Sequence, residues 1–135
     1  MRIIQTFSWI ARLAGLGALI LGLLFWFAGI ALISLHMIFG FLVAISLLAL
    51  SIALITTRGG RVLGIIGVVF AIVVPVVGEL QTGWYVLNAL WLVPTIHLLL
   101  GVAAVGLAQV ITGRYMRLKQ TEIQTSSLRA SQAAH

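Results

Sequence analysis

The sequence between Arg12 and Arg58 reads LAGLGALILGLLFWFAGIALISLHMIFGFLVAISLLALSIALITT (residues 13–57) and contains no charged side chain. A helix rises about 1.5 Å per residue and the hydrocarbon core of a bilayer is about 30 Å thick, so about 20 residues cross it once. The run is too long for one crossing, and it suits two crossings joined by a tight turn at 27–30. It therefore predicts membrane helices near 7–28 and 33–57.

A third predicted helix follows a short basic loop. Arg58, Gly59, Gly60 and Arg61 form a loop that is too polar to remain in the hydrocarbon core. The apolar stretch after it predicts a helix near 62–78, which we expect to end at Gly78 and Glu79.

The rest of the chain contains one more predicted crossing. A second charge-free stretch, residues 80–113, is too long for one crossing and too short for two. Its first part, 80–92, is rich in aromatic and amide side chains, which predicts a segment in the outer headgroup region. We expect the fourth helix to run from about 93 to 113 or beyond, followed by a basic and polar cytoplasmic tail at 114–135 that is mostly flexible.

The composition supports a single membrane domain. Of 135 residues, 62% are hydrophobic and 7% are charged, whereas a soluble domain of this size carries roughly 25% charged residues. The absence of cysteine excludes disulfides, thiolate zinc sites, iron–sulfur clusters and covalently attached haem. No nucleophile–base pair or carboxylate pair suggests hydrolysis or group transfer.

The distribution of charge predicts the orientation. With four crossings, every lysine and arginine falls on one side of the membrane, and the other side carries only Glu79. Basic residues accumulate on the cytoplasmic side, so we expect both termini in the cytoplasm and the chain in the cell's inner membrane. The net charge of +6 thus reflects orientation, and no nucleic-acid partner is expected. Two deeper polar residues have their own predicted roles, Arg12 reaching to the cytoplasmic interface and Gln109 forming an interhelical hydrogen bond.

A short repeat links the second and fourth predicted helices. Residues 34–40 read SLHMIFG and residues 95–101 read TIHLLLG, so both run hydroxyl, aliphatic, His, three apolar residues, Gly. Both helices run in the same direction, which places the two histidines at similar depth near the outer face. The repeat predicts an all-α four-helix bundle of two like hairpins, related by an approximate two-fold axis along the membrane normal.

The repeated histidines suit the ligation of one haem b. Haem iron in electron-transfer proteins accepts axial ligands on both faces, and neutral imidazole is a good ligand, so we predict His36 and His97 in this role. Gly40 and Gly101 follow four residues later, on the same helix face and about 6 Å further along it, where a flat macrocycle needs small residues. A hydroxyl, Ser34 or Thr95, or a backbone carbonyl is expected to orient each imidazole.

The same residues also allow an interpretation in which the protein binds no cofactor. Glycine eases contact between membrane helices, and a histidine near the interface can simply hydrogen-bond to its neighbours. The chain would then be a non-redox structural or assembly subunit. A small transporter is the weakest alternative, because coupling to protons needs a carboxylate deep in the membrane and Glu79 lies at a helix end.

The two histidine motifs resemble those of membrane cytochromes of the b561 type and of haem A synthase. The resemblance covers only about 34–50 and 95–110. It implies four-helix units that hold haem b between helical histidines, and with two intramembrane histidines the limit is one haem per chain. Such a chain would exchange electrons with quinol or a protein redox partner, alone or as a subunit of a redox complex. Whether it is an oxidoreductase component, and whether it forms a homo-oligomer, the sequence leaves open.

Overall fold

The described part of the chain forms four helices in the computed structural model. Residues 2–30, 32–83 and 92–133 are described, and the helices are α1 (Arg2–Ala28), α2 (Ile33–Ile55), α3 (Arg61–Gly83) and α4 (Leu92–Ala133). All four are long and apolar enough to cross a membrane. The prediction of an all-α protein with four helices of membrane-spanning length and hydropathy is therefore confirmed for the described residues.

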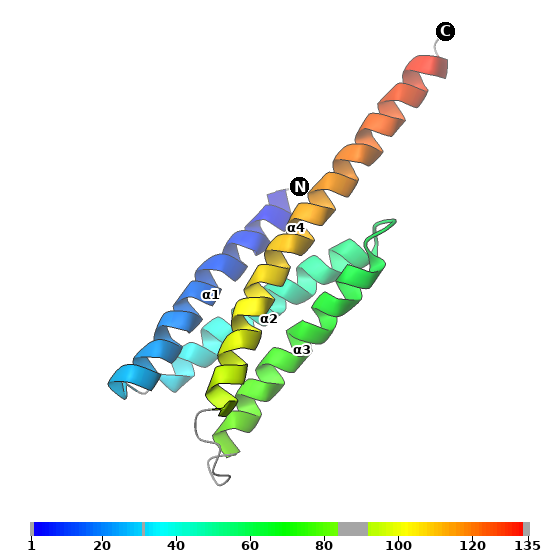
Figure 1. Ribbon diagram of the computed structural model, residues 1–135. Helices are drawn as coiled ribbons and strands as arrows, with labels where there is room; N and C mark the ends of the chain where they lie inside the picture. The colour runs from blue at the N-terminus through cyan, green and yellow to red at the C-terminus, as the bar shows by residue number, and fades with distance from the viewer. Residues whose placement is uncertain (1, 31, 84–91, 134–135) are drawn as a thin grey trace.

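The helices form an up-down bundle in which α2 and α4 share the centre. Among the described residues, every pair of helices is in contact except α1 and α3 (Figure 1). Because the helices alternate in direction, α2 and α4 run parallel. We call the end with Arg2, the 58–60 loop and Arg114 the basic end, and the opposite end, with Gly29, Ile30 and the start of α4, the histidine end.

The core of the described residues consists of aliphatic and small side chains. Leu47, Leu50 and Leu54 of α2 are almost fully buried, as is Ile111 of α4. Alanine supplies most of the remaining buried hydrophobic positions, namely Ala11, Ala14, Ala71, Ala104 and Ala108. Small side chains allow helices to approach closely in a membrane, and many larger apolar side chains face outward, where lipid would solvate them.

The turn between α1 and α2 depends on a glycine. Gly29 has a φ of +66°, in the left-handed region that favours glycine at the end of a helix. The amides of Gly29 and Ile30 bond to the carbonyls of Phe25 and Leu24, at 3.2 and 3.4 Å, which satisfies two carbonyls of the last helical turn. The turn predicted at 27–30 thus lies where α1 ends.

The third helix extends further than predicted. Gly78 and Glu79 were expected to end it, but α3 continues through both residues, and through Pro75, to Gly83. That prediction was wrong because Gly78 is used for packing, against His97, and does not cap the helix. Most of the predicted outer segment, residues 84–91, lies outside the described residues.

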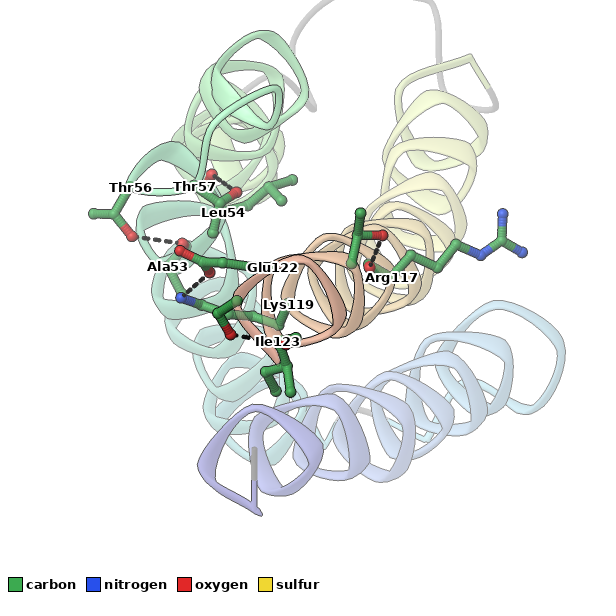
Figure 2. A network of polar contacts seen from close by, with 10 residues as sticks. Ala53, Leu54, Thr56, Thr57, Arg117, Lys119, Glu122 and Ile123 are labelled. Atoms are coloured by element: carbon green, nitrogen blue, oxygen red, sulfur yellow. Dashed lines mark hydrogen bonds and ion pairs between the residues drawn. The ribbon is translucent and has the colours of Figure 1, made fainter. Parts of the chain in front are cut away.

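The fourth helix projects beyond the bundle at the basic end. Tyr115 and Leu118 still pack against the core, whereas the described side chains from Gln120 onward are exposed (Figure 1). This extension is held by local contacts, including the 2.8 Å ion pair between Lys119 and Glu122 (Figure 2). The prediction of a mostly flexible tail at 114–135 was therefore wrong for its described part, because α4 continues through it to Ala133.

Close packing between α2 and α3 leads to a stability prediction. A Cβ atom on Gly67 would overlap the hydroxyl of Ser51 and the end of Ile111, and Ser51 is held by a 2.6 Å bond to the Leu47 carbonyl. We expect Gly67→Val to destabilise the protein by about 1–3 kcal/mol through overpacking. Thermal unfolding in detergent, followed by tryptophan fluorescence, measures the effect.

The control for this variant is Gly106→Val. A Cβ at Gly106 meets nothing within 4 Å, so the intrinsic helix propensity changes in the same way without a steric conflict. If both variants unfold at the same temperature, the close approach of α2 and α3 at Gly67 is contradicted.

Candidate functional site

The two repeated histidines face each other at the histidine end of the bundle. His36 lies in the first turn of α2 and His97 in the second turn of α4. Their ring centroids are 6.0 Å apart, and the ring planes are inclined by 59°. Both residues are partly buried. Two side chains far apart in the sequence are therefore brought together where α2 and α4 meet.

His36 is oriented by the helix that precedes it. Its Nδ1 lies 2.9 Å from the carbonyl oxygen of Ala18 in α1. A carbonyl can only accept, so Nδ1 carries the proton in this bond and neutral Nε2 keeps its lone pair. Backbone carbonyls orient many metal-binding histidines in this way. The Ala18 carbonyl of α1 thus fixes the tautomer of His36. The sequence had left open whether Ser34 or a backbone carbonyl would have this role.

His97 has a different environment. Its Nδ1 is buried and has no hydrogen-bond partner among the described residues. Leaving a buried polar nitrogen without a partner costs about 1–3 kcal/mol. The ring packs against Gly78 of α3, where an added Cβ would lie 2.9 Å from Cε1 of the imidazole. The imidazole of His97 therefore fits closely against α3, and its Nδ1 has no partner in the part of the chain that the structure describes.

Each histidine is backed by a glycine of the preceding helix. A Cβ on Gly22 of α1 would lie 3.4 Å from Cε1 of His36, and Gly78 plays the same part for His97. The sequence did not predict either role, and Gly78 was expected to end the third helix. The two glycines precede their histidines by different distances along the chain, so no sequence repeat identifies them.

The two glycines of the repeat lie in open surroundings. Gly40 and Gly101 are partly buried, yet a Cβ on either would meet nothing within 4 Å. Neither glycine brings two helices into close contact, which is the role that a packing interpretation gives them. The predicted use of Gly40 and Gly101, to leave room beside the histidines, stays a prediction.

His36 and His97 provide two donor side chains, fewer than a metal ion bound by protein side chains alone requires. Among the residues that the structure describes, no group of three or more His, Cys, Asp or Glu side chains could hold a metal ion. A protein zinc site needs three or four such ligands, whereas haem iron needs only axial ones. With a metal–nitrogen bond of about 2 Å and about 1 Å from that nitrogen to the ring centre, two opposed imidazoles lie about 6 Å apart.

Known proteins add no further constraint on this site. Comparison of the chain with protein-family models, curated protein sequences and solved structures finds no match in any of the three. The chemistry open to the site therefore follows from the two imidazoles, the glycines around them and their place in the bundle.

Proposed function

We propose that the chain is a membrane b-type cytochrome, which binds one haem b between His36 and His97 near the outer face of the cell's inner membrane. One observation carries the proposal: the ring centroids of these histidines are 6.0 Å apart, close to the spacing of two imidazoles on opposite sides of one metal. The role that fits is electron exchange with quinol or a redox partner, by the chain alone or as a subunit of a redox complex.

The residues around the histidines support this ligand set. The bond to Ala18 leaves Nε2 of His36 with a free lone pair, as a metal ligand requires. His97 would supply the second imidazole ligand. Its Nδ1 has no hydrogen-bond partner among the described residues. The open space beside Gly40 and Gly101 lies on the same helix faces as the ligands, where side chains would obstruct a macrocycle.

The chain's own part in electron transfer is to hold and shield the site. When bound, haem supplies a one-electron couple between ferric and ferrous iron. His36 and His97 would fix its position, and the Ala18 carbonyl would keep the imidazole of His36 in one tautomer. Exposed apolar side chains near the histidine end, such as Phe25 and Leu35, would lie in lipid and limit the access of water to the site.

The proposed orientation follows from charge. The arginines Arg2, Arg58, Arg61 and Arg114 gather at the basic end, which the positive-inside rule assigns to the cytoplasm. The histidine end then faces outward. The matching pairs, Gly22 with His36 and Gly78 with His97, fit two hairpins related by a two-fold axis along the bundle. A site at one face serves electron exchange at that face rather than transfer across the whole membrane.

The first test is the visible spectrum of the purified protein. Expression with ample haem supply and purification in mild detergent should yield a coloured protein, with sharp bands on reduction by dithionite and about one haem per chain. A folded, colourless protein that takes up no added haemin would contradict the proposal. The histidines would then be packing residues, consistent with the hydrogen bond to Ala18, and the chain a non-redox subunit.

A further inference from the structure

A basic groove lies between α1 and α4, near the end of the molecule opposite to the histidines. Its volume is about 710 Å³, and its lining includes Arg2, Gln5, Trp9 and Arg12 of α1 and Thr112 of α4. The lining contains two arginines and no carboxylate. The groove therefore has the charge of an anion-binding site.

The chain cannot neutralise these arginines with its own acidic side chains. It has two acidic residues, Glu79 and Glu122. Glu122 pairs with Lys119 at 2.8 Å, and Glu79 lies in the last turns of α3, toward the histidine end. Neither acidic side chain lines the groove, so an anion bound there would supply the counter-charge of Arg2 and Arg12.

Arg12 is held at the groove by a polar cluster. Its Nε donates a 2.5 Å hydrogen bond to Oε1 of Gln109, which also accepts a 3.0 Å bond from the hydroxyl of Ser8. Its guanidinium lies 5.1 Å from the ring centre of Trp9. The bond to Gln109 uses Nε, and the terminal nitrogens of a guanidinium match the oxygens of a phosphate in a bidentate pair.

The depth of Arg12 favours a ligand from the membrane. Arg12 lies about 15 Å along the helix from Arg2 and only about 4.5 Å beyond Trp9, so its side chain can reach the cytoplasmic interface, where lipid phosphates lie. Exposed tryptophans such as Trp9 are typical of the headgroup region. Beyond Arg12, the exposed side chains of Leu13 and Leu16 continue the surface of α1 as an apolar track for an acyl chain.

We propose that this groove binds an anionic phospholipid, with its phosphate paired to Arg12 and with Arg2 adding positive charge nearer to the basic end. The chemistry recognised is a phosphodiester that is attached to acyl chains and whose negative charge is not balanced by a cationic headgroup. The proposed orientation places the groove in the cytoplasmic leaflet, where lipid headgroups carry negative charge. This inference does not depend on haem binding.

The test compares lipids and arginine variants in detergent. Native mass spectrometry and thermal unfolding are recorded with added phosphatidylglycerol, phosphatidylcholine or inorganic phosphate. We expect the wild-type protein to bind phosphatidylglycerol about tenfold or more tightly than phosphatidylcholine, and to retain one molecule in the gas phase. Arg12→Gln should abolish the preference and Arg2→Gln should reduce it. The matched control, Arg61→Gln, removes a charge at the same end but outside the groove lining and should retain it.

Three results would overturn the proposal. Equal affinity for both lipids would show that the headgroup charge is not recognised. An equal loss in Arg12→Gln and Arg61→Gln would indicate a diffuse basic surface without a site. Stabilisation by inorganic phosphate alone, as large as that by phosphatidylglycerol, would indicate a soluble anion. Arg2→Gln leaves the bond between Arg12 and Gln109 in place, so its result stands even if Arg12→Gln does not fold.

Discussion

Replacing either His36 or His97 with alanine will abolish bound haem. Because the proposed site has only two protein ligands, one from α2 and one from α4, each single substitution removes one side of the coordination. We expect both variants to purify without the reduced absorption bands and with haem content lowered at least about tenfold. Pigment extraction and the reduced-minus-oxidised spectrum measure the change.

The control for the ligand variants is His135→Ala. This histidine is at the end of the chain, outside the described residues, and its replacement should leave the spectrum unchanged. Circular dichroism separates loss of haem from loss of the fold, because the helical signal must survive in His36→Ala and His97→Ala. A wild-type spectrum in either ligand variant would contradict the assignment of that histidine.

Leucine at Gly40 or Gly101 will also lower haem binding, while leaving the apoprotein folded. An added Cβ meets nothing within 4 Å at either position, so a larger side chain has space in the apoprotein. Leucine also has a higher helix propensity than glycine, which favours the folded helix. In the holoprotein the same space is assigned to the macrocycle, so we expect haem content to fall about tenfold or more. Haem titration and the unfolding temperature of the apoprotein are measured side by side.

Gly106→Leu is the matched control for these two variants. Gly106 is also on α4 and also has open surroundings, but it lies beyond the histidine motif. This variant should bind haem as the wild type does. Full haem content in both Gly40→Leu and Gly101→Leu would show that the space beside the histidines is not used by the cofactor.

The parts of the fold that follow from local sequence were predictable. Charge-free runs of known length count the crossings, because the thickness of the bilayer sets the length of each helix. Four crossings make the second and fourth helices run parallel, so the position of each histidine within its helix is enough to predict that His36 and His97 share one depth. The interhelical hydrogen bond predicted for Gln109 is confirmed, with Ser8 and Arg12 as partners.

Features that depend on the packing of helices were not predictable. Nothing in the sequence around Gly78 distinguishes a glycine that ends a helix from one that receives a histidine ring, so the end of α3 was placed too early. The role of Gly22 depends on the rotation of α1 about its axis, which a nearly uniform apolar sequence does not specify. The groove beside Arg12 likewise exists only once α1 and α4 are in contact.

The most direct test of the central claim is electron paramagnetic resonance of the oxidised wild-type protein at low temperature. Ferric haem held by two imidazoles is six-coordinate and low-spin, so we expect a low-spin signal that disappears in both His36→Ala and His97→Ala. A high-spin signal in the wild-type protein, or a low-spin signal that survives the loss of either histidine, would contradict coordination by this pair.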